Sequence, residues 1–164
     1  MNTPLKLIGL SKKYNSKEAV RDISFEVNKN EIIGILGPNG CGKTTTIGMI
    51  LGLLKPTKGK VFINGIDIEN QRVNILDQLN FISPYIELPK KLSVKQNLEV
   101  YGRLYDVKNL DTKIEYLSEK LRLDKIINKI TGELSSGQKN RVSLAKSIIN
   151  DPAILLLDEP TASL

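Results

Sequence analysis

One stretch of this sequence has residue types and spacing with a clear chemical use. Residues 37–44 read Gly-Pro-Asn-Gly-Cys-Gly-Lys-Thr and satisfy the pattern G-x-x-x-x-G-K-[ST]. Glycines let a loop turn successive backbone N–H groups toward phosphates, and a following helix presents its positive N-terminus to the same anion. Lys43 can reach the β- and γ-phosphates, and the Thr44 hydroxyl can ligate Mg²⁺. The predicted nucleotide contacts here are Gly37, Pro38, Asn39, Gly40, Cys41, Gly42, Lys43, Thr44 and Thr45.

Two acidic residues, Asp158 and Glu159, end a second apolar run at 154–157. A carboxylate at the tip of a buried strand can hold Mg²⁺ opposite Thr44, directly or through water. Side chains alternate along a strand, so the next acid points elsewhere and can polarise an attacking water. Acids also end strands simply because they meet solvent, but a phosphate loop in the same chain favours the catalytic interpretation. We therefore predict Asp158 as a metal ligand and Glu159 as the catalytic base.

The elements that would position these residues follow from hydrophobic periodicity. Strands are predicted at 5–8, 19–27, 31–36, 60–63, 66–68 and 153–157. The runs at 31–36 and 153–157 are apolar throughout, as expected of strands buried on both faces of a parallel sheet. Asn64-Gly65 is a strong hairpin signal.

Helical periodicity is found in four places. One helix should follow the glycine-rich loop, from Lys43 to about Leu54. Ser93 is a good N-cap for a second helix, whose apolar face carries Val94, Leu98, Tyr101 and Tyr105. A third helix is marked by Ile114, Leu117 and Leu121, and a fourth spans Gln138 to Asn150. Strands at both ends of a helical insert predict an α/β core that carries an α-helical subdomain.

Composition limits the classes of protein that this chain can belong to. With 164 residues, 40% of them hydrophobic and 26% charged, the chain fits one ordinary domain and is not disordered. A single cysteine excludes a disulfide scaffold, and no apolar run is long enough to span a bilayer. The start has no signal-peptide pattern, so we expect a cytoplasmic protein. The net charge of +6 is spread along the chain and aromatics are only 5%, so no nucleic-acid partner is expected.

Residues 134–138, Leu-Ser-Ser-Gly-Gln, lie immediately before the fourth predicted helix. They resemble the signature LSGGQ of the ATP-binding subunits of ABC transporters, and the resemblance extends over essentially the whole chain. It implies that Ser135, Gly137 and Gln138 close on the γ-phosphate bound to a second subunit, by anion binding at a helix N-terminus. It also implies that Tyr14 stacks on the adenine.

The resemblance implies an α/β fold. This fold is a P-loop NTPase core with a mostly parallel sheet, an N-terminal antiparallel β subdomain and an α-helical signature subdomain. Residues 1–164 would form a single incomplete domain whose C-terminal part is missing, with about 1–83 and 151–164 in the core and about 84–150 in the helical subdomain. The implied cofactors are ATP and Mg²⁺, and the implied activity is ATP hydrolysis coupled to transport.

The implied partners are a transmembrane permease subunit and a second ATP-binding subunit, identical or different. The chain would then be cytoplasmic and peripheral on the inner face of the cell membrane. The residues at 44–47 and 52–57 most resemble ATPases that pair with exporter-type membrane subunits. Two alternatives remain: a soluble ABC ATPase that acts on DNA or ribosomes, and a truncated chain that binds nucleotide but is inactive.

Three features depart from the family pattern. Ser136 replaces the usual glycine, a modest change if the backbone there avoids positive φ. Pro84 stands at the glutamine position of the Q-loop and has no side-chain oxygen for Mg²⁺ or the attacking water. The sequence ends at Leu164 and has no histidine, whereas the family continues to a switch histidine. We therefore expect little or no turnover from the 164 residues alone.

Overall fold

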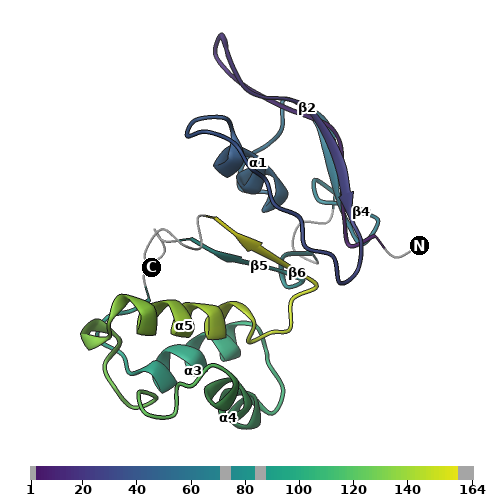
Figure 1. The fold of residues 1–164 in the computed structure, drawn as a ribbon. Helices are drawn as coiled ribbons and strands as arrows, with labels where there is room; N and C mark the ends of the chain where they lie inside the picture. The colour runs from purple at the N-terminus through teal and green to yellow at the C-terminus, as the bar shows by residue number, and fades with distance from the viewer. Residues whose placement is uncertain (1–2, 71–74, 84–87, 159–164) are drawn as a thin grey trace. The chain divides into compact units, whose positions relative to one another are not determined.

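The structure is a computed structural model that describes residues 3–70, 75–83 and 88–158. The chain divides into two compact units, Met1–Leu79 and Asn80–Leu164, whose elements can be followed in Figure 1. Pro84 and Glu159, for which roles were predicted above, lie outside the described residues. Within the described part, no helix combines the length and the apolar character needed to cross a membrane.

The first unit contains a four-stranded antiparallel sheet with the strand order β2-β1-β3-β4. Its strands are β1 (Leu5–Tyr14), β2 (Lys17–Val27), β3 (Lys58–Ile63) and β4 (Ile66–Asp67). The predicted hairpin is confirmed, because Asn64 and Gly65 join β3 to β4 with φ values of 49° and 79°. Lys60 forms an ion pair with the Asp67 carboxylate at 2.9 Å. The predicted antiparallel N-terminal sheet is thus present.

Helix α1 (Lys43–Ile50) begins where the sequence predicted and ends four residues earlier. After the helix, Gly52 adopts a φ of 64°, its N–H donates to the Met49 carbonyl, and the N–H of Leu53 donates to the Gly48 carbonyl. This pair of hydrogen bonds is the Schellman ending of a helix, which glycine favours at the left-handed position. The glycine in the sequence was therefore the stop signal, ahead of Pro56 and Gly59.

The prediction of a buried strand at 31–36 is wrong for the described structure. The segment forms no strand, and the side chains of Ile32 and Leu36 are 97% and 94% exposed. A strand requires a neighbour for its backbone hydrogen bonds, and this segment joins neither of the described sheets. The continuous apolar run led to the prediction of a buried strand, but an apolar composition does not supply a second strand to pair with.

The second unit holds a two-stranded parallel sheet and a helical layer. The strands are β5 (Leu79–Ile82) and β6 (Ile154–Leu157). The helices are α3 (Val94–Leu104), α4 (Leu110–Lys120), the 3₁₀ turn η1 (Thr131–Glu133) and α5 (Ser136–Ser147). In Figure 1, α3, α4 and α5 gather into one group beside the sheet.

Strand β6 is the predicted run at 153–157, but it is only partly covered. The side chains of its first three residues are half-buried, and Leu157 is 46% exposed. The expectation of a strand buried on both faces is therefore wrong for the described residues. Within them, β6 has a single neighbouring strand, β5, and so lacks the second neighbour of an interior strand.

The helical core follows the predicted faces. Val94 and Leu98 of α3 are fully buried, and Tyr101 and Tyr105 pack against the same cluster. The core side chains that the other two helices contribute are Ile114, Leu117, Val142 and Ala145. Ser93 caps α3 in a reciprocal pair, because its hydroxyl accepts from the Gln96 N–H while the Gln96 side chain accepts from the Ser93 N–H. The cap predicted from Ser93 is confirmed.

Candidate functional site

The glycine-rich loop has a backbone that requires glycine at two positions. Gly40 and Gly42 have φ values of 81° and 99°, in the region that other residues rarely adopt. A Cβ atom on Gly42 would collide with the Ala19 carbonyl oxygen and would lie 2.9 Å from a methyl carbon of Val20. The end of the loop thus runs directly against β2. Of the three glycines in the loop, Gly40 is therefore favoured by its φ angle, and Gly42 by its φ angle and by its close contact with β2.

The N-terminus of α1 is suited to an anion. Gly42 occupies the N-cap and provides no side-chain hydrogen bond, and the first turn contains no acidic residue. The Lys43 ammonium donates to the carbonyls of Gly37 and Pro38 at 2.7 and 3.1 Å, so it bends back over the loop. Uncapped helix amides together with a nearby cation favour phosphate at this position.

The three threonines of α1 have different environments. The Thr46 hydroxyl is buried and donates to the Gly42 carbonyl at 2.9 Å, which ties the first turn together. Thr44 is exposed and Thr45 is half-buried. Cys41 is an exposed free thiol in the loop. Thr44 is thus the most exposed of the three threonines, its role as a metal ligand stays a prediction, and Cys41 is open to reagents.

Tyr14 lies at the end of β1 and is 45% exposed. The Lys12 ammonium sits 5.3 Å from the ring centroid, within the range of a cation–π interaction, and also donates to the Lys55 carbonyl at 2.6 Å. An exposed aromatic face is available for stacking. The adenine contact itself stays a prediction.

The residues of the signature turn, 134–138, form the start of α5. Ser135 is the N-cap, its hydroxyl accepts from the Gln138 N–H, and the Gln138 side chain accepts from the Ser135 N–H. Ser136 and Gly137 are exposed in the first turn, and no acceptor is found for their N–H groups among the described residues. Neither has a positive φ, so the serine in place of the family glycine fits without strain. The first turn of α5 can thus receive an anion.

Arg141 is a structural residue that the sequence reasoning missed. Its guanidinium donates to the carbonyls of Leu121 and Arg122 at 3.2 and 2.8 Å, and so caps the C-terminal end of α4. Arg122 has a φ of 55°, which turns its carbonyl toward α5. No periodicity or turn motif marks this contact, because its partners are backbone atoms about 20 residues away. It holds the helix that follows the signature turn against α4.

Asp158 follows β6 directly and is 5% exposed. Its N–H donates to the Ile82 carbonyl at 2.9 Å, which extends the pairing of β6 with β5. The predicted position at the tip of the strand is as expected. Asp158 and Thr44 belong to different units, so their joint role in holding Mg²⁺ stays a prediction.

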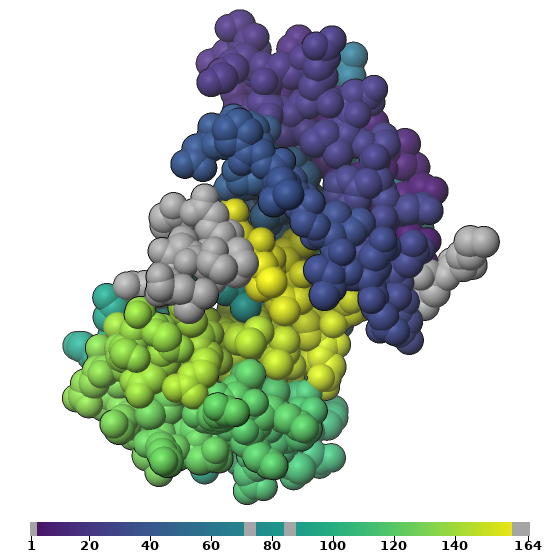
Figure 2. Space-filling view, viewed as in Figure 1, coloured from purple at the N-terminus to yellow at the C-terminus, as the bar shows by residue number. Residues whose placement is uncertain are grey.

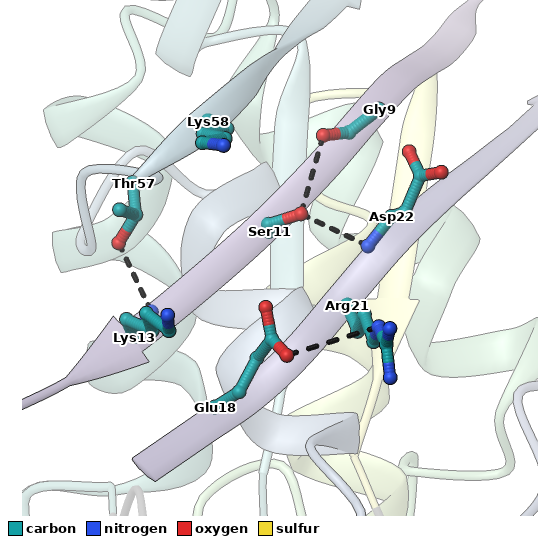
Figure 3. A pocket seen from close by; sticks show the side chains of 8 residues that line it. All are labelled: Gly9, Ser11, Lys13, Glu18, Arg21, Asp22, Thr57 and Lys58. Atoms are coloured by element: carbon teal, nitrogen blue, oxygen red, sulfur yellow. Dashed lines mark hydrogen bonds and ion pairs between the residues drawn. The ribbon is translucent and has the colours of Figure 1, made fainter. Parts of the chain in front are cut away.

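A polar cavity of about 340 Å³ lies on the N-terminal sheet, apart from the predicted site residues (Figure 3). The Ser11 hydroxyl accepts from the Asp22 N–H at 2.9 Å, and Glu18 pairs loosely with Arg21 at 3.8 Å. The ladders of β1 with β2 and with β3 shift register in this region, where the hydroxyl replaces a backbone acceptor. Its lining carries cations and carboxylates together, which favours no single ligand charge.

Shifted pKa values are found for three groups among the described residues, Asp67, Tyr105 and Lys146. The hydrogen bond from Lys60 holds the pKa of the Asp67 carboxyl below its usual value. Burial raises the pKa of Tyr105 and lowers that of Lys146, whose ammonium lies 4.8 Å from the Tyr101 ring centroid.

Known proteins resemble this chain over most of its length. The family model described as ABC transporter matches residues 20–162. The Nod factor export ATP-binding protein I of Rhizobium johnstonii is 39% identical over 160 residues, which are 96% of this chain and 51% of that protein. The ABC transporter ATP-binding protein NatA of Bacillus subtilis is 35% identical over 165 residues, covering 96% of this chain and 67% of NatA. The chain thus spans from about half to two thirds of the length of these relatives.

Solved structures give the same result. An ATP-binding subunit of an ABC transporter superposes with a TM-score of 0.89 at 26% identity, over 99% of this chain and 68% of that one. A nucleotide-free ATP-binding cassette from an ABC transporter gives a TM-score of 0.82 at 26% identity, over 100% of this chain and 71% of that one. The predicted α/β fold class is confirmed.

Proposed function

The chain belongs to the ABC transporter family, and on that premise we propose that it binds MgATP and, in the whole protein, hydrolyses it to power transport. The observation that carries the proposal is the loop at 37–44, where an uncapped helix N-terminus and Lys43 adjoin glycines with positive φ, one of which, Gly42, leaves no room for a side chain. An arrangement of this kind selects a polyphosphate over a neutral ligand.

Each predicted site residue has a role in this proposal. Backbone N–H groups of 37–42 and the first turn of α1 cradle the phosphates, and Lys43 exchanges its carbonyl acceptors for phosphate oxygens. Thr44 and Asp158 would hold Mg²⁺, whose charge would offset that of the phosphates. ATP supplies the phosphoanhydride bond that is cleaved. Glu159 orients the attacking water and accepts its proton.

We place a second ATP-binding subunit and a membrane permease among the partners. Ser135, Gly137 and Gln138 would contact the nucleotide held by the second subunit, since the first turn of α5 is exposed and free of acids. Tyr14 would stack on the adenine. One relative is named an export ATP-binding protein, which supports an exporter-type permease as the partner. A chain that contacts such a permease would be peripheral on the cytoplasmic face of the membrane.

Cys41 provides the experiment that tests nucleotide binding. The thiol is exposed, and it lies within the loop that would surround the phosphates. We expect maleimide to label it in the free protein. MgATP at about ten times its dissociation constant should slow labelling about tenfold, because only the unoccupied fraction can react. Mass spectrometry of the intact chain measures the rate.

Two variants control this experiment. Cys41→Ser should resist the reagent and bind MgATP nearly as well as the wild type, since serine is of similar size. For Lys43→Ala, MgATP at the same concentration should slow labelling by no more than about twofold, because a tenfold or greater loss of affinity leaves at least half of the sites empty. Equal labelling of the wild type with and without saturating MgATP would show that Cys41 does not line the nucleotide site.

Hydrolysis is tested separately through Glu159. In the whole protein, Glu159→Gln should keep MgATP affinity within about twofold and lose about 10²- to 10⁴-fold in turnover, because an amide is a poor proton acceptor. Phosphate release and nucleotide titration give the two values. Undiminished release by the variant would assign the positioning of water to another group.

A further inference from the structure

A buried asparagine joins the start of α3 to the chain that leads into the signature turn. Asn97 is 0% exposed. Its Nδ2 atom lies 2.8 Å from the Thr131 hydroxyl, and 3.2, 3.4 and 3.1 Å from the carbonyls of Pro89, Leu92 and Ser93. An amide nitrogen has two hydrogens, so these four acceptors share them, with the hydroxyl nearest. One side chain therefore holds two segments that are 34 residues apart.

The other end of the same side chain is unsatisfied. Asn97 Oδ1 is buried and has no hydrogen-bond partner among the described residues. A buried acceptor without a donor lowers stability, which offsets part of what the Nδ2 contacts contribute. An apolar residue would avoid this cost. The specific gain from asparagine at this position is the fixed geometry of the two segments.

Backbone hydrogen bonds continue the same connection. The Thr131 N–H donates to the Leu92 carbonyl, and the Gly132 N–H donates to the Lys90 carbonyl, both at 2.9 Å. On the far side, the Leu134 N–H donates to the Thr131 carbonyl at 3.4 Å, and Leu134 is the first residue of the signature turn. Thr131 thus lies between the 89–93 segment and the signature turn and is bonded to both.

We propose that Asn97 and Thr131 are positioning residues for the signature turn. The amide of Asn97 fixes Thr131, Thr131 fixes the start of the turn, and the exposed N–H groups of α5 are thereby held at one orientation. The inference rests on the proposed function, in which this turn contacts nucleotide. Neither residue touches the nucleotide, and their action is through the backbone from 131 to 135.

Hydrogen exchange of the signature amides in the nucleotide-free chain tests the proposal. Thr131→Val keeps the side-chain volume and removes the hydroxyl, whereas Thr131→Ser keeps the hydroxyl. We expect Thr131→Val to speed exchange at Leu134, Ser135 and Gln138 by about five- to tenfold, which corresponds to one hydrogen bond, and Thr131→Ser to stay near the wild type. Ile114→Val, which loses a buried methyl group from α4, is the matched control for lost packing.

The ratio between variants decides the outcome. If Thr131→Val and Ile114→Val accelerate exchange of the signature amides equally, Asn97 and Thr131 contribute only ordinary packing and the proposal is wrong. Exchange at the wild-type rate in Thr131→Val would also overturn it. Exchange of the wild type in urea is a measurement that needs no variant: amides at 131–134 and at Val94 should share one urea dependence, and separate dependences would also overturn it.

Nucleotide binding is a separate readout. In the monomeric chain, MgATP affinity should be unchanged in Thr131→Val, because the phosphate loop belongs to the other unit and the signature turn would contact only nucleotide held by a second subunit. A parallel loss of affinity in Thr131→Val and Ile114→Val would mark a general structural defect and contradict a positioning role. If MgATP does not protect Cys41 from labelling in the wild type, the proposed function is refuted. The hydrogen-exchange comparison of the variants is still valid, because it is made without nucleotide.

Discussion

Replacing Lys43 with alanine should lower MgATP affinity by about 1.5–3 kcal/mol, or roughly ten- to more than a hundredfold. The ammonium bends over the loop and donates to two carbonyls that a bound phosphate would replace with charged acceptors. Truncation removes this charge-assisted contact and leaves the two carbonyls on exposed residues that water can reach. Equilibrium titration with a fluorescent ATP analogue, in competition with ATP, measures the loss.

Lys29→Ala is the matched control for Lys43→Ala. It removes the same charge from an exposed lysine in a turn of the same unit. Its affinity should stay within about twofold of the wild type, since exposed charges act weakly through solvent. Equal affinities for Lys43→Ala and Lys29→Ala, with both chains folded, would refute the assignment of the loop to phosphate binding.

Gly42→Ala should be the most damaging small substitution in the loop. Alanine would have to adopt a φ of 99°, and its Cβ atom would collide with the Ala19 carbonyl oxygen of β2. Backbone strain of about 1–2 kcal/mol and overpacking of about 1–3 kcal/mol together predict a loss of about 2–5 kcal/mol in the free energy of unfolding. The loop must also move away from β2, so MgATP affinity should fall. Urea unfolding measures the first effect and titration the second.

Gly40→Ala separates strain from collision. Gly40 has a φ of 81° in the same loop, but a Cβ atom there would meet nothing within 4 Å. Only the strain of about 1–2 kcal/mol should remain. If Gly40→Ala and Gly42→Ala lower the free energy of unfolding equally, the close approach of the loop to β2 makes no contribution to stability.

Local signals in the sequence predicted the local structure well. Asn64-Gly65 needs only its own backbone preferences to form a hairpin, and Ser93 with Gln96 needs only residues three apart to cap α3. The phosphate loop is local in the same sense, because its glycines, lysine and helix start are consecutive. The signature turn was predicted from the resemblance to a known family, because Ser135 alone would have predicted only an ordinary helix N-cap.

Features that depend on distant partners were not predictable in this way. The run at 31–36 has the composition of a buried strand, yet a strand exists only where another strand pairs with it. The Asn97–Thr131 contact joins residues 34 positions apart. Arg141 donates to backbone carbonyls, and because every residue has one, no residue type in the sequence marks these acceptors. The early end of α1 could have been predicted from the sequence, because Gly52 is the left-handed residue that a Schellman ending favours.

The folded-back Lys43 side chain has a consequence for the entropy of binding. A free lysine side chain has about 2 kcal/mol of rotamer entropy to lose when it is fixed. Here the ammonium is already anchored on the Gly37 and Pro38 carbonyls, so much of that freedom is lost when the chain folds and not when a ligand arrives. The Lys43 side chain is therefore largely ordered before the nucleotide binds. Calorimetry of MgATP binding should show only a small unfavourable entropy from the ordering of this side chain.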